Sequence, residues 1–165
     1  MPDHSTVDIV PYSPAQKKAL ITLSLKAWAP VFDKMKREIP AFIYESFYPD
    51  GWEERQSKDV GAFLEAEGER TFVALRSGEI SGFVGLRLHP EDQMGEVYIL
   101  ATDPDHQRHG VADALIRHVE ERMRQQGMKI SMVETSGDSG HLPARKTYEA
   151  AGYSTLPVAR YFKQL

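Results

Sequence analysis

The order of strand-like and helix-like segments from residue 71 onward constrains the fold more than any other feature. Thr71–Arg76 and Ile80–Leu88 flank a Ser-Gly-Glu turn and predict an antiparallel hairpin. Glu96–Thr102 is apolar or aromatic except at its two ends, which is typical of a central, covered strand. Helix and strand patterns then alternate. This order predicts an α/β domain in which one mixed sheet is flanked by helices.

Three segments follow that central strand. Gly110–Gln126 carries an apolar stripe at helical spacing and is closed by Gly127. Met128–Thr135 has the pattern of a strand, and Pro143–Ala151 has the pattern of a short helix. Residues 153–165 return to strand-like composition around a proline. We expect a strand there.

The N-terminal part predicts one strand and several helices. Val7–Val10 alternates like a strand and stops at a proline. The residue pattern from Ser13 to about Glu67 is typical of helices, and a Ser-Pro pair at its start is suited to beginning a helix. Prolines at positions 30, 40 and 49 are expected to divide this region into two or three short helices.

Length and composition exclude several classes of protein. The chain has 165 residues, so we treat 1–165 as a single domain. Its net charge of -4 and lack of a basic run argue against nucleic acid as the main partner. It has no cysteine, which excludes disulfides, thiolate metal sites and a cysteine acyl-enzyme. No signal peptide or membrane-spanning segment is evident, so we expect a cytoplasmic location without membrane contact.

The segment with most chemical content lies between the central strand and the long helix. It reads Gln107-Arg108-His109-Gly110-Val111-Ala112. Backbone N–H groups at the start of a helix form an anion cradle, and a glycine allows a phosphate to approach the backbone. The same sequence would also fit a glycine that only allows the turn between a strand and a helix. By itself the segment does not distinguish an anion-binding loop from a structural turn.

Two motifs together resemble those of the GNAT superfamily of N-acetyltransferases. The first is the Gln-Arg-x-Gly-x-Ala order that ends at Ala112, after an Asp-Pro strand end. The second is Ala144-Arg-Lys-Thr-Tyr148-Glu-Ala-Ala-Gly-Tyr153, which is similar to that family's Ala-x-x-x-Tyr-Glu-x-x-Gly-aromatic segment. Ala112 stands where a glycine is commonest, and His141 stands where many relatives have an asparagine. The resemblance covers about residues 71–165.

The resemblance implies acetyl-CoA as co-substrate, bound by the core 93–153. Backbone groups at the end of the central strand are expected to hold the pantetheine arm and polarise the thioester carbonyl. The implied cofactor-binding residues come from this strand end, the glycine loop and the start of the last helix: Leu100, Ala101, Thr102, Gln107, Arg108, His109, Gly110, Val111, Ala112, His141 and Ala144.

Two residues are the candidates for catalysis. Tyr148 matches the family tyrosine that hydrogen-bonds the departing sulfur, although it shares a helix face with Ala144 and Ala151 and could instead be a core aromatic. Glu96 opens an otherwise apolar strand and is the candidate general base. Period two places it on the face of Tyr98, Leu100 and Thr102. A glutamate at a solvent-facing edge remains the alternative.

Residues 28–67 are the variable region, expected to form a wall of the acceptor site. They hold half of the 16 aromatic residues, some of which must be core, and nine acidic residues against five basic ones. Trp28, Phe32 and Tyr98 are the candidate substrate-binding residues. An acidic, aromatic wall would attract a cationic amine.

Two other groups of polar residues give weaker evidence of a functional site. His106 and His109 lie in a loop that must embrace a pyrophosphate, so no metal is expected there. Residues 136–141 include Ser, Asp and His but lack the strand–turn–helix setting of a nucleophile.

The sequence therefore predicts transfer of an acetyl group from acetyl-CoA to a primary amine of a small, cationic acceptor. The amine would attack directly in a ternary complex, without an acetyl-enzyme. Alternatives are a protein N-terminal or lysine acetyltransferase, and a non-catalytic acyl-CoA-binding domain. The sequence does not determine whether two copies form a homodimer.

Overall fold

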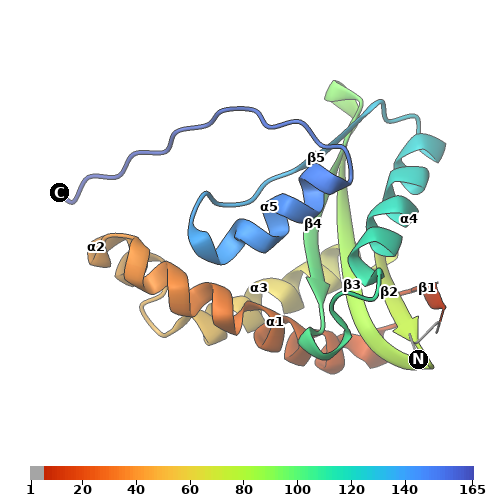
Figure 1. The fold of residues 1–165 in the computed structure, drawn as a ribbon, viewed down its shortest axis with the longest axis horizontal. Coiled ribbons are helices and arrows are strands. Elements are labelled where there is room, and N and C mark those ends of the chain that lie inside the picture. The colour runs from red at the N-terminus through yellow and green to blue at the C-terminus, as the bar shows by residue number, and fades with distance from the viewer. Residues whose placement is uncertain (1–5) are drawn as a thin grey trace.

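The computed structural model describes residues 6–165, which form one five-stranded sheet with helices on both faces (Figure 1). The strands, in their spatial order, are β1 (Val7–Pro11), β2 (Thr71–Arg76), β3 (Glu79–His89), β4 (Met94–Thr102) and β5 (Ile130–Val133). The helices are α1 (Lys17–Glu38), α2 (Ala41–Phe47), α3 (Trp52–Glu67), α4 (Val111–Gln125) and α5 (Leu142–Ala150). β1 to β4 pair antiparallel and β5 is parallel to β4, so the expected mixed sheet is confirmed.

Each face of the sheet has its own hydrophobic core. On one face α4 places Val111, Leu115 and Val119 against β2, β3 and β4. On the other face α1 and α3 pack Leu20 and Leu64 against the sheet. The two cores hold the sheet between layers of helix. This arrangement keeps the backbone of β4 in a fixed position at the centre of the molecule.

Two expectations about the helices and strands themselves are wrong. Pro30 does not divide the first helix, because α1 continues from Lys17 to Glu38. Buried residues precede and follow the proline, and their packing outweighs the missing hydrogen bond. Residues 153–165 form no strand. Pro157 has no N–H to donate, and no strand of residues 6–165 pairs with this segment. The other expected elements are present, with ends shifted by at most two residues.

A β-bulge in β4 changes which side chains share a face. Gly85 pairs with Ile99 but Leu86 pairs with Val97, so Tyr98 is an extra residue on β4. Glu96 and Tyr98 face α1 and α3. Beyond the bulge Leu100 packs with the core under α4. The expectation that Glu96 shares a face with Leu100 and Thr102 is therefore wrong, since simple alternation does not survive the inserted residue.

Candidate active site

β4 and β5, the last two strands of the sheet, are paired along only part of β4. Their pairing runs from Met94↔Ile130 to Val97↔Val133 and goes no further. β4 continues to Thr102 and stays paired with β3 on its other side. The edge of β4 at Leu100, Ala101 and Thr102 therefore has no strand partner among residues 6–165 where it faces β5. Backbone groups along this edge are available to a ligand.

The loop after β4 leads into α4 with unusual backbone angles. Gly110 is the N-cap residue of α4 and has φ +77°, while Arg108 has φ +64°. No side chain caps this helix, so its first N–H groups are free to bind an anion. Gln107, Arg108 and His109 are exposed around these groups. Val111 is buried under the sheet, so only its backbone can serve a ligand.

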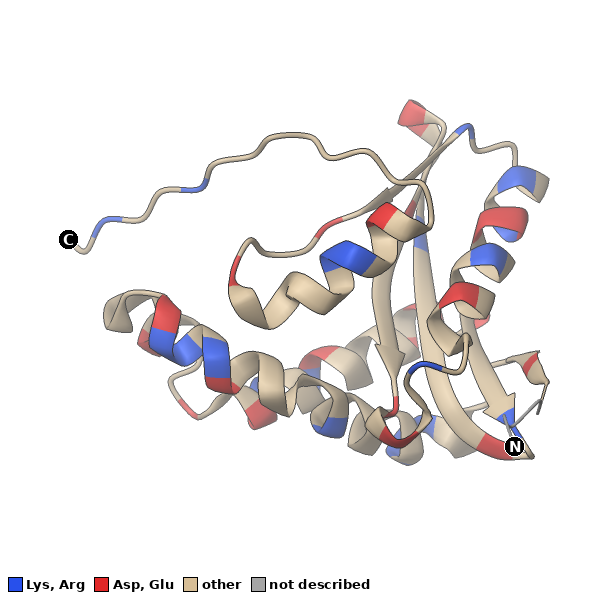
Figure 2. Ribbon diagram, in the orientation of Figure 1, with Lys and Arg blue, Asp and Glu red and all other residues tan. Residues whose placement is uncertain are grey.

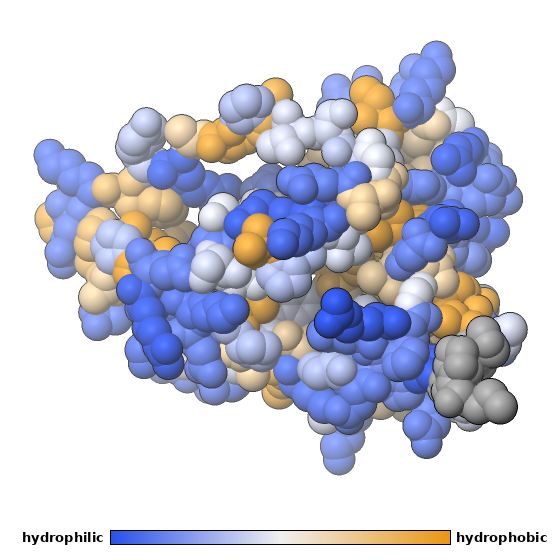
Figure 3. All heavy atoms as spheres, in the orientation of Figure 1, coloured by the Kyte–Doolittle hydropathy of each residue, from blue (hydrophilic) through white to orange (hydrophobic). Residues whose placement is uncertain are grey.

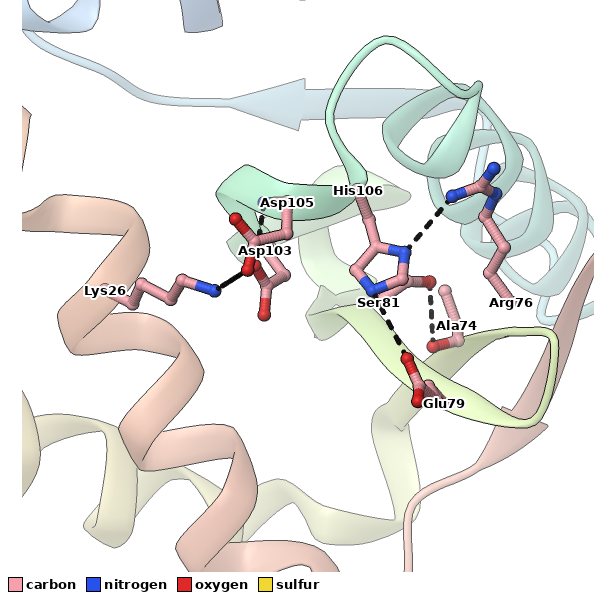
Figure 4. Close-up of polar contacts among 8 residues, drawn as sticks. All are labelled: Lys26, Ala74, Arg76, Glu79, Ser81, Asp103, Asp105 and His106. Atoms are coloured by element: carbon pink, nitrogen blue, oxygen red, sulfur yellow. Dashed lines mark hydrogen bonds and ion pairs between the residues drawn. The ribbon is translucent and has the colours of Figure 1, made fainter. Parts of the chain in front are cut away.

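A polar network fixes the turn that precedes this loop (Figure 4). Lys26 of α1 donates to Asp103 Oδ1 at 2.7 Å and to Asp105 Oδ2 at 2.6 Å. Burial works against ionisation of Asp103, but the Lys26 ammonium and the N–H of Asp105 lower its pKa overall. His106 lies 3.4 Å from Arg76 and 4.0 Å from Glu79. These contacts tie the end of β4 to α1 and to the β2–β3 hairpin.

Tyr148 lies on α5 beside the separated strands. Its ring is 6.0 Å from the ring of Tyr153, whose hydroxyl is 2.7 Å from Ser131 Oγ in β5. Burial, with a smaller contribution from Tyr153, raises the pKa of Tyr148 to about 12. The phenol therefore keeps its proton at physiological pH. No hydrogen bond of the Tyr148 hydroxyl to another residue is found within residues 6–165.

The turn before α5 is held against α1. Glu38 at the end of α1 accepts hydrogen bonds from the backbone and the hydroxyl of Ser139. A Cβ at Gly140 would lie 2.8 Å from the Val31 carbonyl oxygen, so only glycine allows this close approach. His141 Nδ1 is 2.6 Å from Asp138. Because Ser139 bonds Glu38 and not His141, these residues do not form a Ser-His-Asp triad.

Ala144 and Arg145 follow in the first turns of α5. Ala144 is half-buried. The Arg145 guanidinium donates to the carbonyl oxygens of Ser136 at 2.6 Å and Asp138 at 2.7 Å. Arg145 thus stabilises the turn and is not a free cation beside the loop.

Glu96 is paired with a residue that the sequence interpretation missed. His89 Nε2 lies 2.8 Å from Glu96 Oε2, and the Glu96 side chain is 18% exposed. The two side chains share the face of α1 and α3. The strand expected to end at Leu88 continues one residue further, so that His89 is the last residue of β3. When β3 and β4 are paired outward from the turn at residues 90–92, His89 lies opposite Met94 at the start of β4. This pairing is the signal that could have identified His89 from the sequence.

Tyr98 stacks on Phe63 of α3, with ring centroids 4.7 Å apart, and is itself 43% exposed. The Arg87 guanidinium lies 3.7 Å from the Tyr98 ring centroid. Arg87 is also the cross-strand partner of Glu96. Glu96, Arg87 and Tyr98 therefore meet on one surface of the sheet. The expectation that β4 is covered along its full length is wrong, because Tyr98 is partly exposed.

The structure separates the two aromatic candidates on α1. Phe32 is 6% exposed and stacks on Trp52 at 4.5 Å, in a cluster with Met35 and Tyr44. It packs the interior of the helical region. Trp28 is half-buried and contacts both this cluster and the core under α1. Trp28 therefore remains a candidate for acceptor binding, whereas Phe32 lies in the interior of the helical region.

Two general features of residues 6–165 bear on function. No helix among them is long and apolar enough to cross a membrane. No group of three or more His, Cys, Asp or Glu residues is placed to hold a metal ion.

Comparisons with known proteins agree on one family. The profile described as "Acetyltransferase (GNAT) family" matches residues 38–153. A mycothiol acetyltransferase from Saccharomonospora viridis is 31% identical over 128 residues, covering 68% of this chain and 41% of that protein. The chain spans less than half the length of the curated relatives it matches.

Solved structures share the fold at lower identity. The ribosomal-protein-S18-alanine N-acetyltransferase of Escherichia coli superposes with a TM-score of 0.64 at 19% identity, covering 92% of this chain and 80% of that one. An aminoglycoside N-acetyltransferase in complex with CoA gives a TM-score of 0.62 at 16% identity, covering 99% and 98%.

Proposed function

The chain belongs to the GNAT acetyltransferase family, and on that premise we propose that it transfers the acetyl group of acetyl-CoA to a primary amine of a small acceptor. The observation that carries this proposal is the separation of β4 from β5 directly before the free N-terminus of α4. Acetyl-CoA would supply the acetyl group as a thioester. The residues present fit such a ligand, because an unpaired strand edge and an uncapped helix start lie in succession along the chain.

The cofactor would be held mainly by backbone. The N–H groups of residues 111–113 suit a pyrophosphate, with Gln107, Arg108 and His109 exposed around them. The edge at Leu100–Thr102 suits the amide groups of a pantetheine arm. His141 and Ala144, at the start of α5, complete the proposed cofactor site. Fixed N–H donors at this edge would also stabilise negative charge that develops on a carbonyl oxygen.

Tyr148 is the proposed acid for the leaving thiolate. A phenol with a pKa of about 12 stays protonated and can donate a hydrogen bond or a proton to sulfur. Its hydroxyl has no competing partner within the described residues. The ring of Tyr148 lies edge-on to the ring of Tyr153, 6.0 Å away.

Glu96 is the proposed base for the ammonium of the acceptor. Its carboxylate is positioned by the 2.8 Å contact with His89 and is accessible for part of its surface. The proton can be taken directly or through water. Tyr98 would form part of the acceptor wall beside it, together with Trp28.

We propose a cationic acceptor because residues 28–67 carry nine acidic and five basic residues. Arg87 favours a second candidate. Its guanidinium beside exposed Tyr98 could bind a carboxylate, so an acceptor with both an amine and a carboxylate, such as an amino acid, also fits.

Release of CoA thiol from acetyl-CoA, measured with a panel of amines, tests the proposal. Because the chain has no cysteine, a thiol reagent reports only the product. The panel contains polyamines, aminoglycosides, arylalkylamines, amino acids, peptides with free N-termini and lysine-containing proteins. Turnover with a small amine is the expected result. Turnover with only peptides or proteins would overturn the acceptor class, and parallel double-reciprocal lines with an isolable acetyl-enzyme would overturn direct transfer.

A further inference from the structure

α5 carries Tyr148 but has no hydrophobic anchor of its own. None of its residues is fully buried, and none belongs to a hydrophobic cluster of residues 6–165. The segment after α5, residues 154–165, arches away from the body (Figure 1), and open space is visible beneath part of it (Figure 3). Helices in proteins are stabilised mostly by packing of an apolar face. Since α5 lacks such packing, the contacts at its two ends decide where it lies.

The start of α5 is attached to α1. A short 3-10 helix, Ser139–His141, leads into α5 without a break, so its first residue begins the whole helical segment. The Ser139 N–H donates to Glu38 Oε2 at 2.9 Å, and the Ser139 hydroxyl donates to Glu38 Oε1. We call these two hydrogen bonds the α1–α5 clamp. Beside it, Gly140 closely approaches the backbone of Val31, two turns earlier in α1.

The carboxylate of Glu38 serves this clamp and not its basic neighbours. Lys36 and Arg37 stand next to it in the last turn of α1, where Figure 2 shows basic residues in blue. Both Glu38 oxygens accept from Ser139 instead. These hydrogen bonds lower the pKa of Glu38, although partial burial opposes the shift. The group is therefore charged at physiological pH, and a negative charge at the start of a helix is stabilising.

The other end of α5 is attached to β5. The Tyr153 N–H donates to the Tyr148 carbonyl oxygen at 3.0 Å, and the Tyr153 hydroxyl is 2.7 Å from Ser131 Oγ. Tyr148 lies between this attachment and the α1–α5 clamp. Its own hydroxyl has no hydrogen-bond partner within the described part of the chain. The position of the phenol oxygen therefore depends on how the two ends of α5 are held.

We propose that Glu38 is a positioning residue for Tyr148, because it fixes the start of α5 on α1. The inference rests on the proposed role of Tyr148 as the acid. Proton donation to a leaving sulfur needs the phenol oxygen within hydrogen-bond reach of that atom. A displacement of about 1 Å costs up to about a hundredfold in rate. Loss of the clamp frees one end of the helix and places Tyr148 less accurately.

Steady-state kinetics of Glu38→Ala test the proposal in the wild-type and Tyr148→Phe backgrounds, with acetyl-CoA and the amine of the panel that is turned over. With both substrates saturating, Glu38→Ala is expected to lower kcat about three- to tenfold in the chain that has Tyr148. In the Tyr148→Phe background the same substitution should lower kcat less than about twofold, because the positioned hydroxyl is gone.

Asp33→Ala is the matched control for charge. Asp33 is an exposed carboxylate on the same helix and makes no hydrogen bond to the turn before α5. This variant measures what loss of one negative charge on α1 does by itself. Glu38→Ala is expected to lower kcat at least about threefold more than Asp33→Ala does. Equal effects of the two substitutions would overturn the proposal.

The kinetic outcomes separate the clamp from the proposed acid. Equal losses from Glu38→Ala in both backgrounds would show that its effect does not pass through Tyr148, and so overturn the proposal. A change confined to the KM for acetyl-CoA would overturn it too. If Tyr148→Phe by itself keeps wild-type kcat, the proposed acid fails and the proposal fails with it. A slow Tyr148→Phe beside an unchanged Glu38→Ala rejects the clamp alone.

Hydrogen exchange followed by mass spectrometry gives a readout that needs no substrate. Glu38→Ala is expected to speed amide exchange in residues 142–150 at least about threefold and to leave residues 111–125 of α4 unchanged. Ser139→Ala removes one of the two hydrogen bonds, so its effect should be smaller and should vanish in the Glu38→Ala chain. Unchanged exchange in α5 overturns the proposal. Glu38 is exposed and outside both cores, so loss of folding does not confuse the result.

Discussion

The cofactor side and the acceptor side of the proposed site are built in different ways. From Leu100 to Ala112 the groups offered to a ligand are mainly backbone N–H donors, set by a strand edge and by the φ of Gly110. On the acceptor side they are side chains from β3, β4 and α1, with Phe63 of α3 supporting Tyr98. Backbone sites depend on local sequence order. Side-chain sites depend on how distant elements pack, so substitutions on the two sides should separate binding of the donor from chemistry and acceptor choice.

The largest effect is expected at the acceptor side, from Glu96→Gln. Loss of the carboxylate should lower turnover on the order of 10²- to 10⁴-fold for a strongly basic amine, which arrives protonated. A weakly basic amine that is neutral at the assay pH should lose far less. Glu91→Gln, an exposed neighbour of His89, is the matched control. Equal losses for both kinds of amine would remove Glu96 from the role of base.

Tyr148→Phe is expected to lower kcat on the order of ten- to a thousandfold while the affinity for CoA stays unchanged, because only the hydroxyl is removed. Calorimetry with CoA and steady-state rates separate the two quantities. Wild-type turnover would return Tyr148 to a packing role.

The alkaline limit of activity is a second test of Tyr148. Its folded pKa of about 12 exceeds the ordinary 10.0, so the phenol remains protonated and active above pH 10. The raised pKa also means that protonated Tyr148 stabilises the folded protein. This contribution to the free energy of unfolding is complete below the unfolded pKa of Tyr148 and is lost as pH rises from about 10 through 12. Activity should rise with pH as the amine loses its proton, without falling near pH 10. A fall centred at pH 10 would contradict this.

Gly110→Val should act on the cofactor side alone. Valine at φ +77° costs about 1–3 kcal/mol of strain and places a branched side chain at the anion cradle. CoA affinity is expected to fall about ten- to a hundredfold. Gly127→Val is a close control, since Gly127 has φ +79° and equally open surroundings but follows α4. We expect both variants to be destabilised to a similar extent in thermal unfolding. CoA affinity should fall only in Gly110→Val.

The same contrast explains what could be predicted from the sequence. The glycine loop, the amphipathic helix and the central strand are local patterns, and each lies where the sequence predicts it. The mixed sheet follows from their order. The faces of β4 could not be predicted, because the inserted Tyr98 is detectable only as a register shift against β3. The burial of Phe32 could not be predicted for a related reason. Whether an aromatic on an amphipathic helix lines a cleft depends on what covers it, here Trp52 from another helix.

His89→Gln sharpens the contrast with a smaller effect. Glutamine keeps a hydrogen-bond donor but not the ring that fixes the Glu96 carboxylate. We expect kcat to fall about three- to tenfold for basic amines with little change in KM. His109→Gln, on the cofactor side, is the comparison, and it should alter CoA affinity more than kcat. A change in KM alone at residue 89 would place His89 in acceptor binding and not in positioning Glu96.

The smallest effect concerns which acceptor the surface around Tyr98 prefers. Arg87 is a cation beside exposed Tyr98, so it opposes binding of a polyamine or aminoglycoside and assists binding of a carboxylate. A partly exposed charge pair is worth about 0.2–1 kcal/mol, which corresponds to about a 1.4- to fivefold change in affinity. For the proposed cationic acceptor, Arg87→Gln should therefore lower KM by about that factor, whereas Arg117→Gln on α4 leaves it unchanged. A rise in KM, seen most strongly with amino acids, would reject the cationic acceptor and favour one that presents an amine and a carboxylate together.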